Sequence, residues 1–419
     1  MAKTFFLLLV LILFSIMPPC PAHASIQSTN DAPPVPVLSD WAEVFLITAG
    51  PGKRIWERFG HNAIWFRDSQ HQIDIVYHWG VFSFQSDKFW PRFLFNSMRF
   101  AIQSLPPQDF LVDKNIACQS LWIQNLSLTT NQMQSLFSLC YLNDTDGFRY
   151  YDYDYYNNNC STRIRDVLDQ VLDGAIKQTC STNITAHTRR WHCRRFLQFF
   201  PAVYLGVQCV LGSPADQPIS AWDEMFLPLS LQEHLRFVFN PGSGLDDMPL
   251  VWSEMPLAVS SVPVPPSPQS YFPYFLMLSF GICFLLVALA LHQSNTYCRV
   301  AIALLSGVWS LAAGLTGSLL LFAILFTSHS FWFWNQNVFQ LNPLSLFLVI
   351  PSLLIAFNRK TSVFVLYLAY SVAGLSLFGL LLKLIPFFYQ ENAEIIAITL
   401  PLHCTLTFIF YRQLKIHYH

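Results

Sequence analysis

Charged residues are scarce in this sequence: Asp, Glu, Lys and Arg make up only 12% of its 419 residues, whereas 53% are hydrophobic. So little charge excludes a wholly soluble protein and points to a membrane. Neither sign of charge is in excess, because 24 basic residues balance 25 acidic ones. Without a basic excess the chain lacks the electrostatic attraction that nucleic acid requires, so we expect no nucleic-acid partner.

Long apolar runs are absent from residues 40–258, where strand, helix and loop patterns alternate as in a globular domain. Beyond a Pro-rich linker at 259–270 the pattern changes abruptly. Apolar runs there predict a membrane domain of about five helices over 271–411, followed by a cytoplasmic tail at 412–419. The runs cover 271–291, 300–326, 344–357, 361–388 and 394–411.

The first 24 residues pair Lys3 with an apolar run and end in the small-residue site Ala22-His23-Ala24. This pattern predicts a secretory signal peptide over 1–24 and a tether over 25–39; an uncleaved anchor is the alternative. A cleaved signal places domain 40–258 outside the cytoplasm. The connections between spans agree, because Lys and Arg lie in the predicted inner segments and are missing from the outer loops.

Segment 150–174 is the centre of the globular region: a Tyr-rich strand ends at a polar corner and continues as an amphipathic helix that stops near Gly174. Cys160 stands at this corner, and Ser161 and Thr162 offer hydroxyls to the first free amides. The positive end of the helix dipole, together with Arg163 and Arg165, should lower the pKa of the thiol.

A disulfide is the alternative for Cys160, because exported cysteines are more often paired than catalytic. If Cys160 stays a thiol, Cys180 and Cys193 are the preferred disulfide, since they lie close together around a loop. The remaining extracytoplasmic cysteines have no deducible pairing; they are Cys118, Cys140 and Cys209.

Two predicted strands supply a histidine pair that can serve the thiol. Segment 56–66 runs from a Gly-marked turn into the first strand, which carries His61, and the second strand, 73–84, carries His78. A turn centred between residues 69 and 70 places these histidines opposite each other, whereas a slip of one residue breaks the pair. His61 would then take the proton from Cys160 and His78 would orient the His61 ring. The alternative is that both are structural core histidines.

Other catalytic motifs are missing. His71, His187, His192 and Cys193 show no CxxC or HExxH spacing, so a zinc site is an alternative without support from a motif. We assign no metal ligand and expect no cofactor. No G-x-S-x-G is present, which disfavours a serine triad.

Five segments carry a resemblance in combination; in chain order they are FGHNAIWF, VYHWGVFSF, YDYDYYNNNCSTRIRDVLD, AWDEMFLP and SHSFWFWNQNVFQLNPLSL. Together they resemble the bacterial family of Lnb-type lipoprotein N-acyltransferases over nearly the whole mature chain. The resemblance implies an α+β fold, a permuted papain-like domain similar to NlpC-type enzymes and lecithin:retinol acyltransferase. In that domain the catalytic histidine precedes the cysteine; by motif they are His61 and Cys160. The strand motif typically bears asparagine where this chain has His78, which leaves the third role open.

The resemblance also implies a function: transfer of an acyl chain from a phospholipid, through a Cys160 thioester, to the α-amine of a diacylglyceryl-cysteine lipoprotein. Asn159, Ser161 and Arg163 are candidates for substrate or oxyanion binding. For Arg163 a salt bridge to Asp166 or to a neighbouring acid is an equal alternative. The alternatives for the whole protein are a membrane-bound cysteine peptidase or lipid hydrolase with the same Cys/His dyad, and a non-catalytic membrane scaffold.

The loop between the second and third spans carries three polar candidates, His329, Asn335 and Asn337. We favour a structural role at the membrane interface, where Trp332 and Trp334 suit an aromatic belt. Direct contact with substrate is the alternative.

Overall fold

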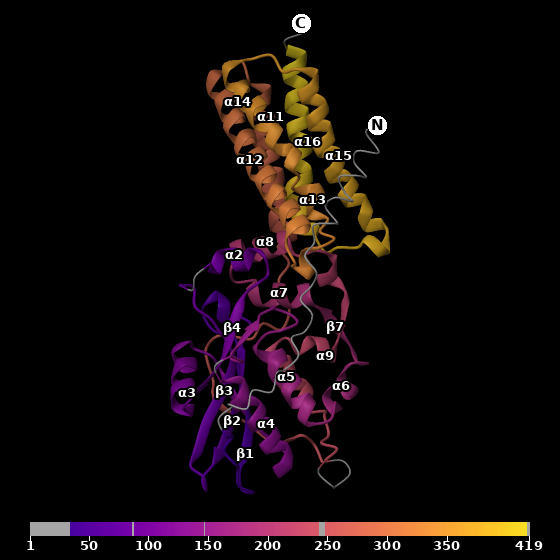
Figure 1. Ribbon diagram of the computed structural model, residues 1–419. Coiled ribbons are helices and arrows are strands. Elements are labelled where there is room, and N and C mark those ends of the chain that lie inside the picture. Colours follow the sequence, from indigo (N-terminus) through magenta and orange to yellow (C-terminus); the bar gives the residue numbers. More distant parts are fainter. Residues whose placement is uncertain (1–33, 86–87, 146, 243–247, 417–419) are drawn as a thin grey trace. The chain divides into compact units, whose positions relative to one another are not determined.

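The computed structural model describes residues 34–85, 88–145, 147–242 and 248–416 (Figure 1). The signal peptide expected at 1–24 and most of the expected tether lie outside the described residues. From Pro36 onward, the extracytoplasmic domain and the membrane helices belong to a single unit.

A seven-stranded antiparallel sheet forms the framework of the N-terminal domain, in the order β6-β4-β3-β2-β1-β5-β9. The internal strand β1, fifth in this order, is buried along nearly its whole length, since both of its neighbours and the packed helices exclude water. The strands are β1 (Glu43–Ala49), β2 (His61–Asp68), β3 (Ile73–Val81), β4 (Arg99–Leu105), β5 (Leu121–Leu126), β6 (Tyr150–Asp152) and β9 (Val251–Ala258). A separate two-stranded sheet pairs β7 (Ile184–Thr188) with β8 (Pro218–Ser220).

The turn between β2 and β3 is four residues long and is organised by Asp68. Its buried carboxylate accepts hydrogen bonds from the backbone N–H groups of Ser39, Gln70 and His71. The strands pair with Asp68 opposite Ile73, so the turn centres one residue later than the sequence predicted. The predicted pairing of His61 with His78 is therefore wrong by two residues. A shift of two preserves the face on which each side chain lies.

Helix α5 (Cys160–Val171) contacts β2 and β3, and it buries Ile164, Leu168 and Leu172 completely. The predicted capping is correct for Thr162, whose hydroxyl accepts from the N–H of Asn159 at 2.8 Å, but not for Ser161, whose hydroxyl has another partner. The Asn159 side chain, which was not predicted as a cap, accepts from the N–H groups of Ser161 and Thr162, 2.9 Å away in each case. Helical structure ends as predicted just before Gly174, whose positive φ of 83° suits glycine.

Eight further helices belong to the described part of the domain, and among them α3 packs on β3 and α10 on β1. They are α2 (Phe89–Leu94), α3 (Pro107–Ile116), α4 (Thr130–Asn143), α6 (Ala175–Cys180), α7 (Arg189–Leu197), α8 (Pro201–Val210), α9 (Ala221–Glu224) and α10 (Pro228–Leu235).

Five apolar helices long enough to span a membrane follow residue 271, which confirms the predicted number. The third span is broken into short helical pieces, the first of which ends before Pro343. The break packs against the second span at Gly314 and Gly317, where a Cβ would collide with Leu346 and Leu341. These glycines therefore let the two backbones approach closely. The segments are α11 (Phe272–Leu291), α12 (Thr296–Phe326), α13 (Asn337–Gln340), η4 (Pro343–Leu348), α14 (Val349–Leu354), η5 (Ile355–Phe357), α15 (Val363–Leu381) and α16 (Ala393–Ile416).

Candidate active site

The structure brings His61 and His78 together as diagonal neighbours on one face of the sheet. The pairing of β2 with β3 puts Ile64 opposite Tyr77. If the same register is extended by a few residues, His61 lies opposite Gly80 and His78 lies opposite Ala63. Diagonal side chains on one face remain within reach of each other. Nε2 of His61 lies 3.0 Å from Nδ1 of His78, and the ring of Phe110 packs against both imidazoles.

Cys160 reaches this histidine pair because Gly80 has no side chain. A Cβ built on Gly80 would lie 3.3 Å from Cβ of Cys160 and 3.7 Å from Cε1 of His61. Gly80 also has a φ of 94° and lies at a bulge in β3, where the pairing with β4 shifts register. Cys160 and His61 therefore both approach the space that a side chain at position 80 would fill. The role of Gly80 was not predicted from the sequence, because the alternation of apolar and polar residues does not indicate where a strand contains a bulge.

Burial controls the protonation of this site. Burial raises the pKa of the Cys160 thiol, and hydrogen bonds from backbone N–H groups, led by that of Asn62, offset this only in part. The expected fall in the pKa of Cys160 is therefore wrong: removal of water outweighs the helix terminus. Burial also lowers the pKa of His61 well below 6.5 and that of His78 to about 4. The resting pair is consequently a neutral thiol beside a neutral imidazole.

Lys114, at the end of α3, is a charged neighbour that sequence reasoning missed. Its positive charge lowers the pKa of both histidines and of Cys160, in each case less than burial changes it. The ammonium group lies 5.2 Å from the ring centre of Phe110 and 3.1 Å from the carboxylate of Asp113. Lys114 thus provides cationic charge that the prediction had assigned to Arg163 and Arg165.

Two residues predicted to bind substrate or oxyanion have other partners. The Asn159 side chain caps α5 and donates to the carbonyls of Tyr155 and Phe226. The Ser161 N–H is held by that cap, and its buried hydroxyl donates to the carbonyl of Met225. Both side chains are therefore committed to positioning the helix that carries Cys160.

Arg163 does not form the alternative salt bridge. The carboxylate of Asp166 accepts instead from Arg165, 2.7 Å away. The guanidinium of Arg163 lies 4.5 Å from the ring centre of Tyr151, a residue whose pKa is raised by burial and by the nearby Cys160.

The predicted disulfide between Cys180 and Cys193 is not formed, because both residues are free thiols. Each is buried at a different place: Cys180 ends α6, whereas Sγ of Cys193 on α7 lies 2.9 Å from the hydroxyl of Tyr156. Proximity in sequence misled the prediction, since β7 separates the two helices.

The three polar candidates of the membrane loop are buried and make structural contacts. Amide groups of Asn335 and Asn337 donate to the carbonyls of Cys209 and neighbouring residues at the end of α8. They thereby satisfy carbonyls that a helix terminus leaves without partners. Nε2 of His329 lies 2.9 Å from the carbonyl of Phe93, and its ring stacks on Trp332.

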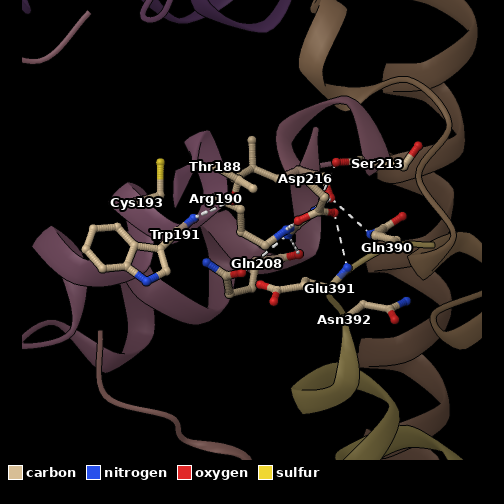
Figure 2. Close-up of polar contacts among 12 residues, drawn as sticks. Thr188, Arg190, Trp191, Cys193, Gln208, Ser213, Asp216, Gln390, Glu391 and Asn392 are labelled. Carbon is tan, nitrogen blue, oxygen red and sulfur yellow. Dashed lines mark hydrogen bonds and ion pairs between the residues drawn. The ribbon is translucent and has the colours of Figure 1, made fainter. Parts of the chain in front are cut away.

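A second set of contacts joins the domain to the loop before α16 (Figure 2). The buried guanidinium of Arg190 binds both oxygens of Asp216, at 2.6 and 3.1 Å, and donates to the carbonyls of Leu211 and Gly212. Asp216 also accepts the backbone N–H of Glu391 at 3.1 Å. Arg194 completes the junction by binding the Glu391 carboxylate at 2.7 Å. The membrane loops and α7–α8 therefore share one polar network.

Comparison with known proteins agrees with this architecture. One family model, the Lnb N-terminal periplasmic domain, matches residues 38–193, and a second, the Lnb transmembrane domain, matches residues 269–414. Neither curated proteins nor solved structures give a significant match.

The sheet-rich domain and the five apolar helices confirm the predicted fold class and a multi-pass membrane protein with an extracytoplasmic N-terminal domain. Family membership suggests a membrane enzyme that modifies lipoproteins. The two matches together cover most of the chain, which belongs to the Lnb family.

Proposed function

We propose that the protein is a lipoprotein N-acyltransferase that carries an acyl chain on Cys160, from a phospholipid to the α-amine of a diacylglyceryl-cysteine lipoprotein. The observation that carries the proposal is the approach of Cys160 and His61 to the same glycine, Gly80, while Nε2 of His61 contacts Nδ1 of His78. A nucleophile, a base and an orienting group are the three parts of thiol catalysis.

The first half-reaction begins from the neutral pair. Because Nε2 of His61 is bonded to His78, Nδ1 is the nitrogen left to accept the proton of the Cys160 thiol. The sulfur attacks the ester carbonyl of the phospholipid, a C–S bond forms and the ester C–O bond breaks. His61 returns the proton to the leaving oxygen, so a lysophospholipid departs and a thioester remains.

The second half-reaction reverses the roles. The α-amine of the acceptor attacks the thioester carbonyl, the amide bond forms and the C–S bond breaks. His61 takes the proton from the amine, and the sulfur recovers a proton as the free thiol. Water is the competing nucleophile at this stage, and its attack would release a fatty acid.

Backbone N–H groups near the sulfur are the candidates for stabilising the oxyanion. Those of Asn62, Ser161 and Cys160 each lower the pKa of the thiol through hydrogen bonding, with Asn62 contributing most. The Ser161 amide also serves the Asn159 cap. The amides of Asn62 and Cys160 are therefore the pair that we assign to the oxyanion.

An aromatic surface supports a lipid donor. Trp90, Phe93 and Phe95, in and just after α2, remain between 44% and 69% exposed. The same segment contacts the end of the second span, since Ser328 donates to the carbonyl of Phe95 at 3.0 Å. Exposed aromatic side chains beside a membrane helix suit the interface from which an acyl chain would be drawn.

Reconstitution into liposomes tests the proposal. Purified protein is mixed with a phospholipid labelled in its acyl chains and a diacylglyceryl-cysteine peptide, and the products are separated by mass. We expect label on the peptide α-amine, lost in Cys160→Ala but retained in the control Cys404→Ala, which changes an exposed thiol on α16. Label found only in free fatty acid would support a hydrolase instead. A scaffold would produce neither product, and the free thiol of Cys160 already disfavours it.

A further inference from the structure

Three histidines converge on one buried carboxylate, outside the thiol site. Glu224 ends α9, and its Oε1 lies 2.9 Å from Nε2 of His192 and 3.5 Å from Nδ1 of His187. Its other oxygen, Oε2, lies 2.8 Å from Nε2 of His234. The histidines come from β7, α7 and α10, so the cluster joins four separate elements of the domain.

The geometry of three of these groups suits a metal ion. The ligand atoms of His187, His192 and Glu224 all lie within 4.8 Å of one another. Bonds of about 2.0–2.2 Å to a tetrahedral zinc ion hold ligand atoms about 3.3–3.5 Å apart. The separation of His187 from Glu224 already has this value, and His192 needs to move only slightly away from the carboxylate. A cavity of about 240 Å³, lined by all four residues, lies beside the ligand atoms.

Neighbouring side chains hold the imidazoles in place. The ring of His187 stacks on Trp191, with ring centres 3.7 Å apart. His192 meets the same indole edge-on and is flanked by Phe226 on another side. Side chains whose orientation is fixed before binding lose little conformational freedom when an ion enters.

We propose that His187, His192 and Glu224 bind a divalent transition-metal ion of the zinc class. Two imidazoles and one carboxylate, with a further position open to solvent, form a ligand set that such ions favour. His234 would orient the carboxylate through its other oxygen, as partners of metal ligands commonly do. The open position faces the cavity, where water or a ligand can complete the coordination.

The site would stabilise the helix that carries Cys160. Glu224 is followed directly by Met225 and Phe226, whose carbonyls accept from the side chains of Ser161 and Asn159 at 2.6 and 2.9 Å. A metal ion on Glu224 therefore fixes the segment that anchors the first turn of α5. The ion would act on the position of the thiol, without touching the substrate.

Metal analysis of the full-length protein tests this inference. The parent is Cys160→Ala, since a thiol also binds zinc, and it is purified without a histidine tag and dialysed against dilute Zn²⁺. We expect about one zinc ion per chain in the parent. The ion should be lost in His187→Ala and in Glu224→Gln, which keeps the shape of the side chain. The matched control is His71→Ala, another partly exposed histidine beside a carboxylate, 3.3 Å from Asp68.

The effect of Zn²⁺ on thermal unfolding is a second measurement on the same proteins. Added Zn²⁺ should raise the Tm of the parent and of His71→Ala, but not that of His187→Ala or Glu224→Gln. A parent that retains no zinc after dialysis would overturn the inference. So would equal zinc content in the parent and both cluster variants.

Discussion

Nε2 of His61 lies 3.0 Å from Nδ1 of His78, and this contact determines which nitrogen of His61 can face the thiol. Burial holds the pKa of His78 at about 4, so at neutral pH its ring is uncharged and Nδ1 can accept a hydrogen bond. Donation from Nε2 then fixes His61 in the tautomer whose Nδ1 carries a lone pair. In the proposed mechanism the orienting group is thus an imidazole, His78, that acts as an acceptor.

Substitution of His78 tests this role. His78→Asn supplies an amide oxygen that can accept the same hydrogen bond, so it should retain most of the activity. His78→Leu fills the space but accepts nothing, and kcat should fall on the order of 100-fold because the His61 tautomer is no longer fixed. Acyl transfer by both variants gives the comparison; equal loss in the two would show that His78 does more than accept a hydrogen bond.

The pH dependence of Cys160 alkylation tests the neutral resting pair. Iodoacetamide reacts with the thiolate, and burial raises the pKa of this thiol above its ordinary value of 9.0. The rate of alkylation should therefore keep rising with pH through 9. A plateau reached below neutral pH would instead indicate a thiolate and imidazolium pair already formed at rest.

Lys114 should affect the acid limb of the pH profile of kcat/KM. Burial lowers the pKa of His61 well below 6.5 and the charge of Lys114 lowers it further, so the neutral base persists in mildly acidic solution. Lys114→Gln removes that charge, the pKa of His61 rises, and the acid limb of kcat/KM should move to higher pH. Lys114→Arg keeps the charge, so its acid limb should stay at nearly the same pH as that of the wild type. The measurement is the pH profile of kcat/KM for the wild type and the two variants.

Gly80 should not tolerate a side chain. Gly80→Ala introduces a Cβ 3.3 Å from Cβ of Cys160 at a φ of 94°, so both backbone strain and crowding displace the thiol. Gly174→Ala is the matched control, because it has a similar φ of 83° but meets no atom within 4 Å. Both variants should lose some stability, whereas only Gly80→Ala should lose most of its acyl transfer. Similar activities in the two would contradict the close approach.

The junction in Figure 2 should be sensitive to the loss of one partner. Asp216→Asn leaves the charge of the fully buried Arg190 without its counter-ion, which should destabilise the protein by about 3 kcal/mol. Glu43→Gln is the control, since it removes one partner of an exposed arginine pair, for which the expected loss is below about 1 kcal/mol. Thermal unfolding in detergent compares the two; equal shifts in Tm would argue against a stabilising junction.

Periodicity was enough to predict the helix that follows Cys160, the two histidine strands and the five spans, because each depends on a local alternation of apolar residues. The register was wrong by two residues, because the turn that Asp68 organises centres one residue later than the sequence indicated. The histidines still met because a shift of two keeps both rings on one face.

The remaining features depend on tertiary structure. Nothing local shows that Met225 would accept the hydroxyl of Ser161, or that burial would raise the pKa of Cys160. The cluster at Glu224 was missed for the same reason: its histidines lie on three elements, without a ligand spacing along the chain.

Mass spectrometry of lipoprotein N-termini tests the central claim most directly. Lipoproteins are isolated from cells that depend on this protein for N-acylation and carry either the wild type, Cys160→Ala or Cys404→Ala. Wild type and Cys404→Ala should yield N-acylated diacylglyceryl-cysteine, whereas Cys160→Ala should leave a free α-amine. N-acylated termini at undiminished levels in the Cys160→Ala strain would contradict the account.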